Sequence, residues 1–235
     1  MFKKLNEIEK IAKSKTTQRI VVAAAADDDV LEALKNAQEL GIIVPVLVGD
    51  VAKIKEIAGK IGLDLTNIEL YDYPDKLEAS DKAVQLIREG KGDILMKGMV
   101  STGILLKSVL NKEEGLRKGD LLSHVALFET AYYHKLLGVT DAAMNVKPDL
   151  VEKIGIIKNA LEVFHKLGHK TPKVAIVGSV ETINPRMEAT MHAATISMMN
   201  YRKQITGCII DGPLAIDGAV SKRASELKHI TSDVA

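Results

Sequence analysis

The chain has 235 residues, 46% of them hydrophobic and 27% charged, so it can bury a sizeable core and is neither disordered nor collagen-like. Its 32 basic and 31 acidic side chains nearly cancel, which leaves no overall field to attract nucleic acid or an anionic membrane. Aromatic side chains make up 3% of the chain, too few to stack nucleotide bases, and no run of about 18 apolar residues predicts a membrane span.

The N-terminal residues predict an amphipathic first helix, because Glu7, Glu9 and Lys10 interrupt what would be the apolar region of a signal peptide. After it, short β-branched runs alternate with stretches of helical period, a pattern typical of strand–helix units around a parallel sheet. Asp27 and the two aspartates after it predict the cap and first turn of a helix. The predicted strands are 18–25, 43–48, 68–71 and 93–96, and the predicted helices are 30–40, 52–61, 80–89 and 103–110.

The second half of the chain continues this alternation with longer helices. We place a lobe boundary between residues 136 and 137, so that 1–136 form a first α/β lobe and 137–235 a second. Because a parallel sheet needs both faces covered and the second lobe has few strands, we expect the natural protein to continue beyond Ala235. The predicted strands are 123–129, 135–139, 173–177 and 204–210, and the predicted helices are 148–167 and 185–201.

The single cysteine, Cys208, lies in the apolar run of residues 205–210, where a thiol packs as a small hydrophobic side chain and is unreactive. One cysteine forms no disulfide framework and no zinc site, which is typical of a reducing compartment. With no signal peptide predicted, we expect the chain to be cytoplasmic.

The residues just after each strand are the first candidates for a site, because open α/β sheets bind ligands beyond the carboxyl ends of their strands. Lys97, Gly98, Ser101 and Thr102 combine a cation, a glycine turn and hydroxyls at a helix start, an arrangement that can cradle an anion. The spacing is not that of a P-loop, and no Gly-x-Gly-x-x-Gly occurs, which disfavours nucleoside triphosphates and dinucleotides. Alternatively, the hydroxyls only cap the helix and the lysine faces water.

A second candidate segment follows the strand predicted at 135–139. Asp141 is followed by small residues that let a ligand approach the backbone, and Asn145 stands ahead of a proline-started helix. A turn or cap role is the alternative for Asp141. His124 is the one histidine that follows a hydroxyl at the start of a predicted buried strand, and a hydrogen-bonded core histidine is its alternative role.

Three further carboxylates, Glu181, Asp211 and Asp217, follow the last two predicted strands and lie near glycines. Carboxylates at strand ends can accept protons or orient a lysine. Because Asp-Gly-Pro is also an ordinary turn, a turn role for Asp211 stays open.

Five short stretches stand out in this chain: KGMVST at 97–102, LLSHV at 121–125, TDAAMN at 140–145, NPRMEAT at 184–190 and DGPL at 211–214. Taken together, they resemble the phosphate acetyl/butyryltransferase family, and within it the butyryl branch. The resemblance implies two α/β/α lobes with mostly parallel sheets, as in isocitrate and isopropylmalate dehydrogenases, and an active site in the cleft between them. It also implies direct transfer of a short acyl group, from butyryl-CoA and phosphate to butyryl phosphate and CoA.

The resemblance implies no metal and no organic cofactor, since CoA is a substrate, and it implies a homodimer or larger homo-oligomer. The family's catalytic Ser-Arg pair belongs to a C-terminal segment that returns to the first lobe and would lie beyond Ala235, so no catalytic residue is assigned. The predicted phosphate- or substrate-binding residues are Lys97, Gly98, Ser101, Thr102, His124, Asp141, Asn145, Glu181, Asp211 and Asp217.

Two alternatives to a phosphate butyryltransferase stay open. One is a catalytically incomplete ligand-binding or oligomerisation fragment of such an enzyme. The other is a related enzyme on the same fold, either a phosphate acetyltransferase or an acyl-ACP:phosphate acyltransferase.

Overall fold

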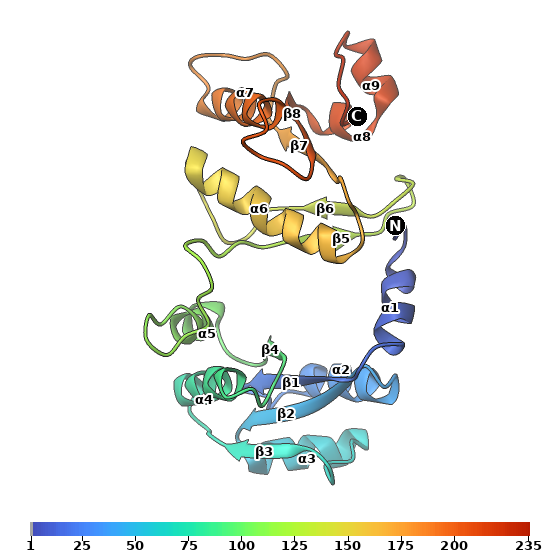
Figure 1. Ribbon diagram of the computed structural model, residues 1–235. Coiled ribbons are helices and arrows are strands. Elements are labelled where there is room, and N and C mark those ends of the chain that lie inside the picture. The colour runs from blue at the N-terminus through green and yellow to red at the C-terminus, as the bar shows by residue number, and fades with distance from the viewer. Residues whose placement is uncertain (1) are drawn as a thin grey trace. The chain divides into compact units, whose positions relative to one another are not determined.

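The computed structural model describes residues 2–235, which divide into two compact units (Figure 1). One unit is Ile8–Asp120, and the other is Leu121–Ala235 together with residues 2–7. Two of the three sheets are wholly parallel, so the predicted α/β class with mostly parallel sheets is confirmed.

The Ile8–Asp120 unit is built on one four-stranded parallel sheet in the order β3-β2-β1-β4. All four predicted strand–helix pairs are confirmed, with ends that differ by up to a few residues. The strands are β1 (Gln18–Ala23), β2 (Ile43–Gly49), β3 (Glu69–Asp72) and β4 (Ile94–Lys97), and the helices are α2 (Asp28–Glu39), α3 (Val51–Ile61), α4 (Lys76–Arg88) and α5 (Thr102–Val109).

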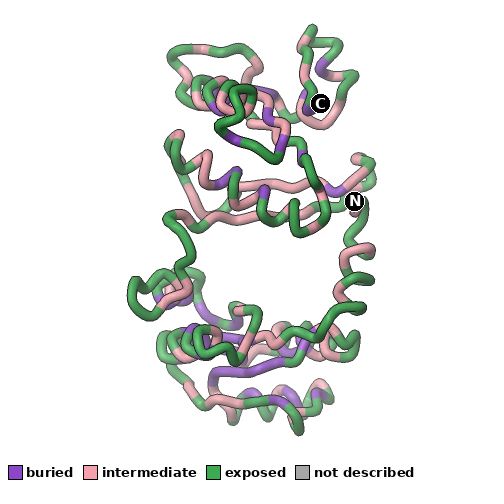
Figure 2. Tube along the Cα trace, in the orientation of Figure 1, coloured by how far each residue is buried: buried purple, intermediate pink, exposed green. Residues whose placement is uncertain are grey.

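Successive residues of β1 bury opposite faces of this sheet, because side chains alternate along a strand. Val21 packs on one face with residues of α4 and α5, and Val22 packs on the other with residues of α2 and α3. Both valines are fully buried, and burial of one such side chain stabilises the fold by about 1.5–3 kcal/mol. Figure 2 shows the buried chain concentrated along β1 and β2.

Aspartates that follow the strands start three helices of this unit, α2, α3 and α4. The side chain of Asp27 accepts the backbone N–H of Val30 and so caps α2, which confirms the predicted cap. Asp75 accepts the N–H groups of Leu77 and Glu78, and α4 therefore begins at Lys76. The helix therefore begins four residues before the predicted start at residue 80.

The Leu121–Ala235 unit holds two small sheets and four helices. Its core is formed by apolar residues of α6, α7 and β8, among them Ile157, Ile196 and Ile210. The antiparallel pair is β5 (Ala126–Phe128) with β6 (Leu137–Val139), the parallel pair is β7 (Lys173–Val177) with β8 (Ile209–Leu214), and the helices are α6 (Leu150–Lys166), α7 (Glu188–Tyr201), α8 (Ile216–Val220) and α9 (Lys222–Leu227).

The prediction of a strand at 204–210 was wrong, because β8 begins later and runs through the Asp-Gly-Pro segment. The side chain of Asn200 donates to the carbonyl groups of Ile205 and Cys208, so these residues form a turn. At the other end, β8 continues past residue 210 because Gly212 has no Cβ, which would lie 2.7 Å from the Ile176 carbonyl oxygen.

The predicted lobe boundary between residues 136 and 137 falls between β5 and β6. These two strands pair with each other, with Ala126 opposite Val139 and Phe128 opposite Leu137. The boundary between two lobes at this place stays a prediction. The predicted first helix is present as α1 (Leu5–Lys13), and Cys208 is buried, with burial raising the pKa of its thiol. Among residues 2–235 no helix has both the length and the apolar character that a membrane span requires.

Candidate functional site

The loop from Lys97 to Thr102 joins β4 to α5 and lies against the end of β1. The N–H of Gly98 donates to the Ala23 carbonyl at 2.9 Å, and the N–H of Met99 donates to the Ala24 carbonyl at 2.8 Å. A Cβ on Gly98 would lie 2.3 Å from the Ala24 oxygen, closer than non-bonded atoms allow. Residue 98 must therefore be glycine for the loop to keep this path.

The polar side chains of the loop take part in its own hydrogen bonding. Lys97 folds over the turn, where Nζ donates to the Val100 carbonyl at 3.0 Å and to the Gly98 carbonyl at 3.3 Å. Ser101 caps α5, its Oγ accepting the N–H of Ile104 at 3.3 Å, and Thr102 begins the helix. An ammonium has three N–H donors, so Lys97 keeps one for an anion. Phosphate binding here stays a prediction.

In the Leu121–Ala235 unit the structure brings His124, Asp141 and Asn145 together. Oδ1 of Asp141 accepts the backbone N–H groups of Ala143 and Met144, each at 2.9 Å. Oδ2 accepts the side-chain amide of Asn145 at 2.5 Å and the backbone N–H of His124 at 3.3 Å. The predicted turn role of Asp141 is thus real, and the same carboxylate joins segments that are 17 residues apart.

These donors set the ionisation of Asp141. Burial alone would raise the pKa of this carboxyl, but the N–H groups of Ala143 and Met144, the Asn145 amide and the N–H of His124 outweigh it and lower the pKa to about 2. Asp141 is therefore a fixed anion at neutral pH and a poor proton acceptor.

His124 is held by hydrogen bonds to both of its backbone polar groups. The Thr140 hydroxyl donates to the His124 carbonyl at 2.7 Å, and the His124 N–H donates to Asp141. Its ring Nδ1 is buried and has no hydrogen-bond partner among residues 2–235. The predicted alternative of a hydrogen-bonded core histidine is therefore not what these residues show.

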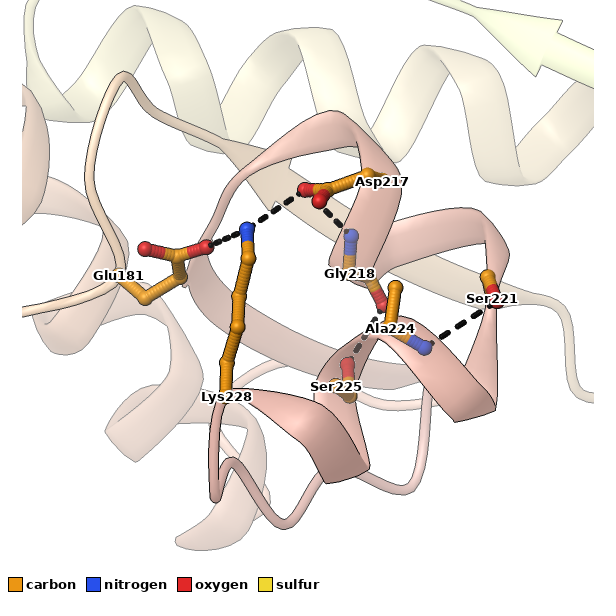
Figure 3. A network of polar contacts seen from close by, with 7 residues as sticks. All are labelled: Glu181, Asp217, Gly218, Ser221, Ala224, Ser225 and Lys228. Atoms are coloured by element: carbon orange, nitrogen blue, oxygen red, sulfur yellow. Dashed lines mark hydrogen bonds and ion pairs between the residues drawn. The ribbon is translucent and has the colours of Figure 1, made fainter.

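Glu181 and Asp217 form a third group, joined by Lys228. Lys228 Nζ lies 2.6 Å from Glu181 Oε1 and 2.8 Å from Asp217 Oδ1. Figure 3 shows the lysine reaching from the end of α9 to Glu181 in the loop after β7 and to Asp217 in α8. The hydrogen bonds and charge of Lys228 lower the pKa of both acids, and the two acids raise the pKa of the lysine.

Sequence reasoning anticipated that such acids could orient a lysine but did not identify Lys228. It lies 47 residues from Glu181 and 11 from Asp217, and no spacing rule links them. Asp211 joins none of the three groups. It lies within β8 instead of after a strand, and its Oδ1 accepts the N–H of Gly212 at 2.8 Å.

Solved structures share this fold. A branched-chain phosphotransacylase from Enterococcus faecalis V583 superposes with a TM-score of 0.78 over 93% of this chain and 76% of its own, at 26% identity. A proposed 4-hydroxythreonine-4-phosphate dehydrogenase from Salmonella typhimurium matches 91% of this chain and 79% of its own, with a TM-score of 0.55 and 12% identity, and indicates the fold alone. The chain therefore has the α/β fold of phosphotransacylases, which the Salmonella protein shares, and the predicted dehydrogenase-like fold is confirmed.

The sequence defines the class more narrowly. A phosphate butyryltransferase from Clostridium acetobutylicum is 48% identical over 235 residues, which is 100% of this chain and 78% of the relative. The profile of the phosphate acetyl/butaryl transferase family matches residues 4–82 and 74–235. The chain belongs to the phosphate acetyl/butaryl transferase family, and the resemblance seen in its motifs is confirmed.

Proposed function

We propose that this chain is a phosphate acyltransferase that exchanges coenzyme A and phosphate on a butyryl group. The observation that carries the proposal is the 48% identity to a phosphate butyryltransferase over all 235 residues. In the forward direction a phosphate oxygen attacks the thioester carbonyl carbon, a C–O bond forms and the C–S bond breaks. The proton of the phosphate passes to the sulfur of CoA, so the products are butyryl phosphate and CoA.

The Lys97–Thr102 loop is the proposed phosphate site. It offers the free N–H donor of Lys97 and exposed hydroxyls of Ser101 and Thr102 at the N-terminus of α5. Phosphate is favoured at such a place by the positive end of the helix dipole and by a nearby cation. The close packing of Gly98 on β1 supports this role, because it holds the loop in one conformation before the anion arrives.

His124 is the proposed donor to the acyl oxygen. A buried N–H without an acceptor costs more free energy than a buried lone pair, so the neutral ring should carry its proton on Nε2 and not on Nδ1. An Nε2–H group can stabilise the negative charge that develops on the carbonyl oxygen. Asp141 and Thr140 support this role by fixing the His124 backbone.

The proposal includes a cytoplasmic location, no metal or organic cofactor, and a homo-oligomer. Met198 and Tyr201 on α7 have exposed fractions of 50% and 78%, and exposed apolar side chains of this kind support self-association. Light scattering should give a molar mass at least twice the 25.5 kDa of one chain, and a mass of one chain contradicts the oligomer.

The test of the reaction is incubation of the purified chain with butyryl-CoA and phosphate in the presence of EDTA. Free thiol should appear together with butyryl phosphate in the ³¹P spectrum, and neither should appear without phosphate. Thiol release that needs no phosphate would show a hydrolase. Binding of butyryl-CoA without release would support the fragment alternative, and a higher kcat/KM for acetyl-CoA or an acyl-ACP would favour the related enzymes.

A further inference from the structure

In the Glu181–Lys228–Asp217 cluster, one lysine pairs with two carboxylates on a partly exposed surface. Its side chains have exposed fractions of 22%, 37% and 55% in that order, and ion pairs in such positions add little to stability. Yet two carboxylates from separate segments converge on one ammonium, with contacts of 2.6 and 2.8 Å. A requirement of stability alone does not explain the arrangement.

The position of the cluster explains it better. Glu181 follows β7 and Asp217 follows β8, so both carboxylates lie past the carboxyl ends of two paired parallel strands. Ligands bind at this edge in open α/β sheets. Two unpaired carboxylates here would repel any substrate that carries a phosphoryl group, and Lys228 cancels one of the two negative charges.

The backbone around the cluster holds Lys228 at this place. The buried hydroxyl of Ser225 on α9 donates to the Gly218 carbonyl of α8 at 2.8 Å, which ties the two helices together. The N–H of Gly218 in turn donates to Asp217 at 2.9 Å (Figure 3). Lys228 is the C-cap residue directly after α9, so its direction follows from the docking of α9 on α8.

We propose that Lys228 is a positioning residue of the transferase: it holds Glu181 and Asp217 in place and offsets their charge, so that this edge accepts a phosphoryl-bearing substrate. The inference rests on the proposed function for the identity of the reaction. The substrate anion can be inorganic phosphate or the phosphoryl groups of butyryl-CoA. Lys228 acts through the two acids and need not touch either substrate.

The test compares Lys228→Met with wild type in steady-state kinetics with each substrate varied. KM for phosphate or for butyryl-CoA should rise about tenfold or more, with a smaller change in kcat, because an unbalanced negative charge opposes binding of an anion. The substrate whose KM rises identifies the anion that approaches this edge. Lys222→Met is the matched control, since Lys222 begins the same helix, α9, but its side chain is 80% exposed and lies 4.0 Å from Glu226.

Charge compensation separates this role from a structural one. The double variant Lys228→Met with Asp217→Asn removes one negative charge along with the lysine and should bring KM back to within about threefold of wild type. Lys228→Arg should keep most of the affinity. If Lys228→Met lowers only the melting temperature and both KM values stay at those of wild type, or if the double variant is worse than the single one, the proposal is wrong.

Direct binding distinguishes failure of this inference from failure of the proposed function. Calorimetry with phosphate alone and with CoA alone should show weaker binding of one of them to Lys228→Met. If that loss is seen but wild type releases no CoA, the proposed reaction is wrong and the role of Lys228 stands. Equal affinities in the two proteins, or no binding of either probe to wild type, overturn the role of Lys228.

Discussion

At the scale of single residues, Asp141 is the most tightly held side chain of the candidate site. Its two oxygens receive three backbone N–H groups and the amide of Asn145. This number of donors predicts that the carboxylate stabilises the folded chain. Asparagine has the same shape but cannot replace it, because its amide NH₂ group would face one of the N–H donors.

Asp141→Asn should therefore lower the free energy of unfolding by about 2 kcal/mol at neutral pH, the amount that corresponds to a pKa of about 2 against an ordinary value of 3.8. Urea unfolding followed by circular dichroism measures the change. Asn145→Ala, which removes one of the donors and leaves the carboxylate, should cost less.

The pH dependence of stability should show the same group. Since the folded-state pKa of Asp141 lies below its unfolded value of 3.8, its contribution is complete above about pH 5 and is lost as pH falls toward 2. The difference in unfolding free energy between wild type and Asp141→Asn should shrink over this interval. A difference that stays constant from pH 5 to about 2 would contradict the assignment of the low pKa to Asp141.

At the scale of elements, the β4–loop–α5 segment depends on Gly98. Gly98→Ala should cost about 1–3 kcal/mol of stability and weaken phosphate binding, because the new methyl group would lie 2.3 Å from the Ala24 oxygen and 2.7 Å from the Ala23 oxygen. Gly103→Ala is the matched control in the same segment. A methyl group there has nothing within 4 Å, and alanine in α5 should be neutral or stabilising by up to about 1 kcal/mol.

Thermal unfolding and phosphate calorimetry of these two variants measure the effect. If Gly98→Ala keeps the stability and the phosphate affinity of wild type, the loop is more pliable than its contacts imply, and its role as a preformed cradle fails.

Elements were predictable from the sequence where local pattern and tertiary pairing agree. The β-branched run of β1 is buried on both faces by α2, α3, α4 and α5, so its pattern directly reflects its place in the sheet. The strand predicted at 123–129 is shorter in the structure because the backbone N–H and carbonyl of His124 bind the side chains of Asp141 and Thr140 in place of a neighbouring strand. Such side-chain partners come from distant segments and leave no local period.

At the scale of the whole molecule, the family and the fold class could be predicted because several short motifs occur together in one chain. The grouping of the site residues could not. His124, Asp141 and Asn145 were named without any indication that one carboxylate connects them, and Asp217 without its lysine. Hydrogen bonds across 17 or more residues depend on how strands and helices pack, which spacing does not report.

The central claim is that this chain transfers an acyl group to phosphate bound at the Lys97–Thr102 loop. The most direct measurement is the rate of CoA release from butyryl-CoA as phosphate is varied, in wild type, Lys97→Met and, as control, Lys107→Met, which changes an exposed lysine on the same α5 helix. We expect saturation with phosphate in wild type and in the control. In Lys97→Met the KM for phosphate should be about tenfold to a hundredfold higher, because this is the loss of affinity that corresponds to one charge-assisted hydrogen bond. Release that does not depend on phosphate, or a Lys97→Met variant with the KM of wild type, would contradict the account.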